Sequence, residues 1–208
     1  GPFPLEPGRI DELNRVFSTA FTDRYHRDGM AGVRVPELNP VVWRFAIATA
    51  GEGAYHWRDS AGNLVAFNLV HSSGNEGWMG PLAVKPEHQG RGLGRAMVTA
   101  GVELLRSRGC TVIGLETMPR TVENIGFYSR LGFRPGYLTV SMMREGRGGG
   151  VAAERGGLLG ERAEGAPAVH ALLDAMAPGL DFDREIDLTL ERSLGDLTVV
   201  RSGSEWRG

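Results

Sequence analysis

The chain has 208 residues, of which 41% are hydrophobic, so it is long enough for one full domain with an extension or for two small domains. Its 23 Lys and Arg residues and 25 Asp and Glu residues give a net charge of −2, which argues against a nucleic-acid partner. No stretch approaches 18 uninterrupted apolar residues, so we expect no membrane partner, and a single cysteine, Cys110, favours the reducing cytoplasm.

The first part of the chain predicts two helices followed by three strands. Apolar residues from Ile10 to Phe21 recur at helical spacing and predict a helix over about residues 8–26. Pro40 marks the start of a second helix over about 41–50. Segments 54–59 and 64–71 are typical of a hairpin, and 77–84 of the next strand.

The second part predicts a helix over about 93–108, a strand at 111–117, a helix at about 121–131 and a strand at 137–143. This order predicts an α/β sandwich, in which helices flank a mixed sheet. We therefore expect one domain at 3–145, a linker rich in Gly, Arg and Glu at 146–165, and a further unit at 166–208.

The extension has two possible interpretations. Segments 168–177 and 183–195 predict helices, and 197–201 predicts a strand. The tail from Leu197 to Gly208 weakly echoes the segment from Tyr55 to Ala66. The extension is therefore either the α/β opening of a second unit of the same kind or a helical appendage of the first domain.

The segment that joins the strand at 77–84 to the next helix carries the clearest chemical signal. Pro86 ends the strand, and Gln89-Gly-Arg-Gly-Leu-Gly94 leads directly into the helix. Glycine at 90, 92 and 94 lets successive backbone N–H groups converge, and the helix start adds its positive dipole end. The segment therefore predicts a loop that binds the phosphates of a carrier.

The spacing of this loop separates the candidate carriers. A P-loop requires Gly-Lys-Ser/Thr, but the only lysine, Lys85, precedes the glycines. A dinucleotide fingerprint requires a third glycine where this chain has Arg95. Glu116 lies at about the distance expected of a ribose-binding acid, so a dinucleotide-dependent oxidoreductase is a poorer but open interpretation.

The loop resembles the Gln-x-x-Gly-x-Gly segment of the GNAT superfamily of N-acetyltransferases, with Gln89, Gly92 and Gly94 at the defining positions. A second motif, Phe127-Tyr128 followed by Leu131-Gly132-Phe133, resembles the family's last helix and the strand after it. The resemblance covers roughly residues 3–145. It implies a mixed, mostly antiparallel sheet flanked by helices, and acetyl-CoA as cofactor, with the loop on its pyrophosphate.

The resemblance also implies roles for individual residues. Tyr128 matches the general acid that protonates the departing thiolate, and its alternative role is to pack between helix and sheet. The strand ending at Val84 is expected to splay from the strand at 114–117, so that backbone at Leu82 and Val84 pairs with the pantetheine arm. Thr121 stands where the family often has asparagine, and Asn124 is expected to substitute for it. The expected cofactor-binding residues are Leu82, Val84, Gln89, Gly90, Arg91, Gly92, Gly94, Arg95 and Asn124.

Three charged residues near these motifs have two possible roles each. Glu116 is a candidate general base for the attacking amine, or it forms an ion pair with Arg120. Arg91 and Arg95 flank the glycines and contact phosphate oxygens, or they are solvated at an exposed helix start. The five histidines are scattered, so no metal site is expected.

The leading hypothesis is therefore an acetyl-CoA-dependent N-acetyltransferase, in which a primary amine attacks the thioester directly in a ternary complex. The alternative is a non-catalytic module that binds coenzyme A as a sensor or scaffold. We expect a small-molecule or peptide amine as acceptor, which the sequence does not identify, and a homodimer stays open.

Overall fold

The computed structural model describes residues 2–136, 170–171, 173–175, 178–179, 181–194, 200–202 and 205–207. The chain divides into two compact units, residues 1–133 and 134–208, which are described separately. The elements of the first unit are β1 (Phe3–Pro4), α1 (Ile10–Arg27), α2 (Pro40–Ala50), β2 (Ala54–Arg58), β3 (Leu64–Ser73), β4 (Glu76–Val84), α3 (Leu93–Ser107), β5 (Val112–Leu115) and α4 (Val122–Ser129), with single 3₁₀ turns at Pro7–Arg9, Gly51–Gly53 and Pro86–His88.

These strands form one five-stranded sheet in the order β1-β2-β3-β4-β5. The pairs from β1 to β4 are antiparallel, and β5 pairs parallel to β4. The expected mixed, mostly antiparallel sheet is therefore confirmed. The strand expected at 137–143 and the linker expected at 146–165 lie outside the described residues.

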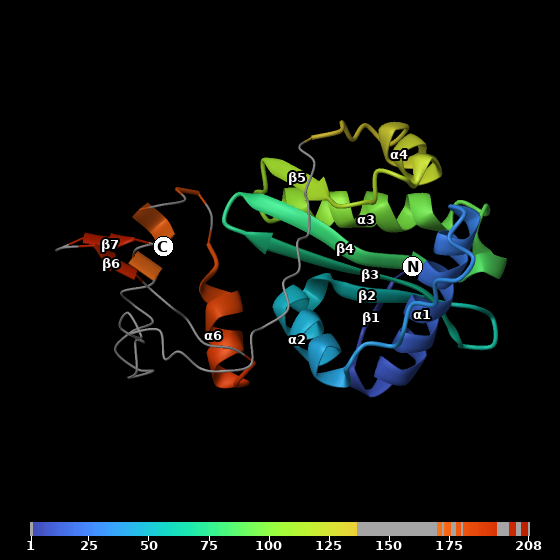
Figure 1. Ribbon diagram of the computed structural model, residues 1–208, viewed down its shortest axis with the longest axis horizontal. Coiled ribbons are helices and arrows are strands. Elements are labelled where there is room, and N and C mark those ends of the chain that lie inside the picture. The colour runs from blue at the N-terminus through green and yellow to red at the C-terminus, as the bar shows by residue number, and fades with distance from the viewer. Residues whose placement is uncertain are drawn as a thin grey trace. The chain divides into compact units, whose positions relative to one another are not determined.

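Helices cover both faces of the sheet, with α1 and α2 on one side and α3 and α4 on the other (Figure 1). The core under α1 and α2 is centred on Trp43, whose indole packs edge-on against Phe67 of β3 and Phe17 of α1. The core under α3 joins Val98 and Leu105 to Val70 and Met79 of the sheet. Trp43 is thus a core residue, 1% exposed.

The segment between α1 and α2 runs back along α1 and is held there by polar side chains four residues apart. Asn14 exchanges two hydrogen bonds with the backbone of Leu38. Ser18 and Thr22 bond the carbonyl and the N–H of Val35. His26 Nε2 lies 2.9 Å from the carbonyl oxygen of Val33. Spacing by one helical turn places these side chains on one face of α1, and they fix the α1–α2 connection.

A bulge in β4 decides the shape of the sheet near the phosphate loop. The β3–β4 register runs from Asn68 opposite Leu82 to Val70 opposite Met79, so Gly80 and Pro81 together face Leu69. An extra residue of this kind bends the strand and increases its twist. The parallel pairing with β5 ends at the same point, with Met79 opposite Leu115. Beyond it β4 continues to Val84 without β5 as a partner.

The second unit contains α6 (Asp183–Glu191) and a hairpin of β6 (Val200–Ser202) and β7 (Glu205–Arg207). Residues 170–171 and 173–175 are also helical. Two helices followed by a hairpin is the order in which the first unit begins after β1. The weak sequence echo agrees with this order, but a second unit of the same kind stays a prediction.

Within the described part of the chain, no helix combines the length and apolarity needed to cross a membrane.

Candidate functional site

The phosphate-binding loop predicted at 89–95 adopts a conformation that depends on glycine. Gly90 has φ +73° and Gly92 has φ +82°, both in the left-handed region that side chains disfavour. A Cβ at either position would meet nothing within 4 Å, so the backbone conformation and not space selects glycine here. Gly92 is the N-cap of α3, and no side chain caps this helix end.

The N–H groups of this loop remain available. The N–H of Gln89 donates to Pro86, and the first bond into α3 runs from Ala96 to Gly92. Between these two, the backbone N–H groups of residues 90–95 donate to no acceptor within residues 2–136. Free N–H groups at a helix start, with the positive end of the helix dipole behind them, favour an anion. The loop is open to solvent, because residues 89–92 are exposed.

Gln89 fastens this loop to the end of β4. Its Nε2 donates to the carbonyl oxygen of Val84 at 2.9 Å. The residue that the first motif singles out therefore holds the loop against the strand from which it leaves. This bond gives the carbonyl group of Val84 a partner. It does not involve the N–H group of Val84.

The backbone at Leu82 and Val84 faces the side of β4 that β5 leaves open. Lys85 donates its N–H to Val65 at 2.9 Å, one step beyond the pair of Val84 and Ala66 in the β3–β4 register. In an antiparallel ladder such hydrogen-bonded pairs alternate with pairs whose N–H and C=O groups point away from the partner strand. Leu82 and Val84 occupy these alternate positions. The open edge expected from the resemblance is thus present, and the bulge is its physical cause.

Helix α4 brings Tyr128 to the same side of the sheet as α3. A Cβ on Gly94, in the first turn of α3, would lie 3.4 Å from the ring of Phe127 in α4. Tyr128 packs edge-on against Phe127 and Phe133 and belongs to the core cluster that also includes Leu82. Burial raises the pKa of the Tyr128 phenol, which keeps it protonated at neutral pH. Tyr128 therefore combines a packed ring with a hydroxyl that retains its proton.

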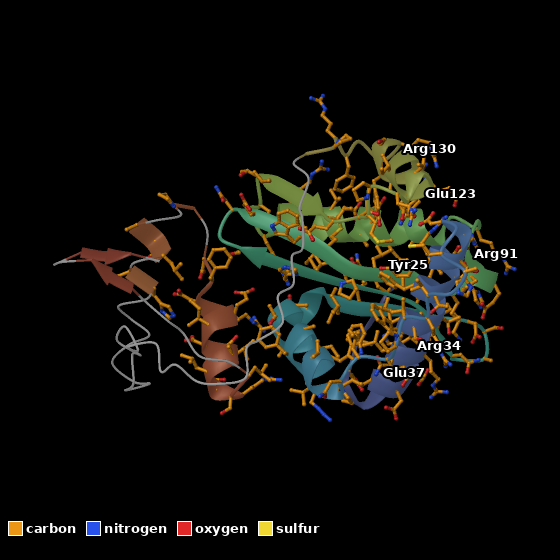
Figure 2. The ribbon with its side chains drawn as sticks, viewed as in Figure 1. Tyr25, Arg34, Glu37, Arg91, Glu123 and Arg130 are labelled. Carbon is orange, nitrogen blue, oxygen red and sulfur yellow. The ribbon has the colours of Figure 1, made fainter. Side chains whose placement is uncertain are left out.

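The other expected site residues differ in their exposure and in the contacts that they make. Glu116 is exposed and follows the last residue of β5 directly, so the expected strand at 111–117 is shorter than predicted. Asn124 Nδ2 lies 3.4 Å from the hydroxyl of Thr117, a long hydrogen bond that ties α4 to the end of β5. Arg95 is exposed, and Arg91 is exposed and points outward at the loop (Figure 2).

Thr121 departs from the family pattern in a way that the structure explains. It is 1% exposed, and its hydroxyl donates a hydrogen bond to Asp28 at the end of α1, 2.7 Å away. It therefore joins two helices instead of facing the open loop. Sequence reasoning missed Asp28, because a contact across 93 residues leaves no local pattern.

Among the residues that the structure describes, no group of three or more His, Cys, Asp or Glu side chains is arranged to hold a metal ion. Cys110 is buried and free.

Comparison with known proteins assigns the chain to a family. Residues 13–133 match the acetyltransferase (GNAT) family. Mycothiol acetyltransferase of Clavibacter michiganensis subsp. michiganensis is 31% identical over 87 residues, which are 42% of this chain and 28% of that protein. Serotonin N-acetyltransferase 2, chloroplastic, of Oryza sativa subsp. japonica is 34% identical over 125 residues, 60% of this chain and 56% of that protein. The chain thus spans less than two thirds of the length of these relatives.

A solved structure supports the fold. The PaiA N-acetyltransferase of Thermoplasma acidophilum, in complex with coenzyme A, has a TM-score of 0.55 to this chain at 15% identity. The match covers 64% of this chain and 89% of that one.

Proposed function

The chain belongs to the acetyltransferase (GNAT) family, and we propose that it transfers an acetyl group from acetyl-CoA to a primary amine by direct attack in a ternary complex. The observation that carries the proposal is the run of backbone N–H groups at 90–95 without acceptors among the described residues, at the start of α3. Coenzyme A carries a diphosphate, and such a run of donors fits it. The exposed guanidinium groups of Arg91 and Arg95 flank the same loop and add charge-assisted contacts.

The open edge of β4 receives the rest of the donor. The pantetheine arm contains amide groups that pair with a strand edge as another strand would. The N–H and C=O groups of Leu82 and the N–H of Val84 are the partners that we propose for the arm. We also propose that an N–H at this edge polarises the thioester carbonyl, and one such donor is worth about a few kcal/mol in the transition state.

The acyl donor supplies a thioester. The amine nitrogen attacks its carbonyl carbon, so that a C–N bond forms and the C–S bond breaks. Tyr128 then donates its phenolic proton to the departing thiolate. Burial raises the pKa of Tyr128, so the phenol is protonated at neutral pH and has a proton to donate. Glu116, exposed at the end of β5, accepts the proton that the amine loses, directly or through water. Asn124 lies in α4 one turn before Tyr128 and is proposed to contact the carrier.

The acceptor is a small-molecule or peptide amine in this proposal. The relatives are named as mycothiol, serotonin and ribosomal-protein alanine acetyltransferases, so they support the reaction class and not one acceptor. We place the choice of acceptor on the α1–α2 side of the first unit, which contains none of the residues proposed to bind the carrier.

The test is thiol release from acetyl-CoA, followed with a chromogenic disulfide while a panel of amines is added. The panel spans polyamines, amino sugars, arylalkylamines and peptides with a free N-terminus. Amine-dependent release that Tyr128→Phe abolishes supports the proposal. Tight binding of coenzyme A without release from any amine would instead favour the sensor or scaffold module.

A further inference from the structure

A partly buried polar cluster joins the end of α1 to the start of α4, and it lies outside every role proposed above. Its members are Arg24, Asp28, Thr121 and Glu123, which we call the α1–α4 latch. Asp28 accepts hydrogen bonds from Arg24 NH2 at 2.6 Å and from the Thr121 hydroxyl at 2.7 Å. Arg24 also pairs with Glu123, which projects from the start of α4 (Figure 2).

The centre of the latch is buried and its outer arm is not. The side chain of Asp28 is 6% exposed and that of Arg24 is 19% exposed, whereas that of Glu123 is 71% exposed. Thr121 is 1% exposed. A buried charge-assisted hydrogen bond is worth more than an exposed ion pair, so the bond between Asp28 and Thr121 is the important one. The hydrogen bond from Thr121 and then the Arg24 guanidinium lower the pKa of Asp28, which keeps it ionised.

The side chain of Thr121 bonds the end of α1 and does not cap its own helix. It is the N-cap of α4, where a threonine hydroxyl normally accepts a hydrogen bond from the first turn of its own helix. No such bond is present, and the hydroxyl donates to Asp28. The start of α4 is therefore fixed by α1 and not by its own cap.

Helix α4 needs an external anchor. It has eight residues, includes Gly126, and contains no buried residue. A helix this short does not persist without tertiary contacts. Its described anchors are the latch at its start, the bond from Asn124 to Thr117, and the packing of Phe127 and Tyr128.

The latch also joins the two sides of the sheet. Helix α1 packs on one face and α4 on the other (Figure 1), and the latch connects the end of α1 to the start of α4. We propose that the α1–α4 latch is a positioning device, which sets the place of Tyr128 relative to the acyl donor and links that place to the acceptor side of the unit. This inference rests on the proposed function, and none of the latch residues is a catalytic residue.

The test uses Thr121→Val, which keeps the shape of the side chain and removes the hydroxyl that Asp28 needs. We expect kcat to fall about tenfold, because small misplacements of a catalytic group have effects of this order or larger. The KM for acetyl-CoA and the affinity for coenzyme A stay within about twofold of wild type, because the loop at 89–95 is untouched. Thr121→Ser restores the hydroxyl and is expected to restore kcat.

Two control variants accompany it. Asp23→Asn removes the ion pair with Arg27, which lies on the same last turns of α1 but does not reach α4. Glu123→Gln removes only the exposed arm of the latch. Both are expected to leave kcat nearly unchanged, since exposed ion pairs contribute little. In a Tyr128→Phe background, Thr121→Val should lower kcat no further, because the two residues act through one group.

Hydrogen exchange separates failure of the latch from failure of the proposed function. Thr121→Val is expected to speed amide exchange in α4 and to leave α1 and α3 as in wild type. Unchanged exchange in α4 would overturn the latch whatever the activity. Faster exchange with unaltered kcat, or a further loss in the Tyr128→Phe background, would overturn its role in positioning Tyr128. If the wild-type protein releases no thiol with any amine, the proposed function and the positioning role are refuted together. Amide exchange in α4 still tests whether the latch holds that helix.

Discussion

Replacing Gly92 with alanine tests whether the backbone of the loop at 89–95 binds the diphosphate. Gly92 has φ +82°, and the space that a Cβ would occupy is open, so the substitution introduces conformational strain and no steric clash. A non-glycine residue in the left-handed region costs about 1–2 kcal/mol. If the loop relaxes to avoid that cost, the N–H groups of residues 90–95 diverge. Restoring their convergence on binding should then weaken the affinity for coenzyme A about five- to thirtyfold.

Gly109 provides a matched control at the other end of α3. It has φ +84°, and a Cβ there also meets nothing within 4 Å. Gly109→Ala should therefore introduce a similar backbone strain away from the loop and leave the affinity for coenzyme A as in wild type. Titration calorimetry and thermal unfolding of the two variants give both quantities. Equal losses of stability with wild-type affinity in both variants would refute the reasoning.

Three further predictions concern the site and the core. Tyr128→Phe should lower kcat by about a hundredfold or more with unchanged affinity for coenzyme A, since general acids contribute factors of this size; near-normal turnover would reduce Tyr128 to a packing role. Because burial raises the pKa of Tyr128, the wild-type kcat should show no loss from this group below about pH 10, and any loss above it should vanish in Tyr128→Phe. His56 is fully buried, and burial lowers its pKa, so the unfolded chain binds more protons below about pH 6.5. The melting temperature should therefore fall from pH 7 to pH 5 less steeply in His56→Gln than in wild type, and equal slopes would contradict this.

Local sequence patterns predicted the elements of the first unit well. The apolar spacing from Ile10 to Phe21 identified α1, and Pro40 marked the first residue of α2. The glycines at 90 and 92 stand where the backbone requires left-handed angles. These features are local, because each depends on residues within a turn or two of the chain. The two-residue strand β1 was missed, since so short a segment carries no periodicity.

Contacts between distant segments were not predictable in the same way. The bulge at Gly80 and Pro81 requires knowledge of the register between β3 and β4. The hydrogen bond from the Gln89 side chain to the end of its own strand was not predicted either, and contact of Gln89 with the carrier stays a prediction. Thr121 pairs with Asp28 at the end of α1, 93 residues away, which no spacing in the sequence indicates. Pairing and burial therefore decide what each residue of the site is free to do.

Amide chemical shifts during a titration with coenzyme A test the central claim most directly. The account predicts that the largest saturable shifts occur at residues 90–95, with smaller shifts at Leu82 and Val84. Pantetheine, which lacks the diphosphate, should move the amides of the β4 edge and leave those of the loop unchanged. Saturation by coenzyme A with the loop amides unmoved would contradict the account.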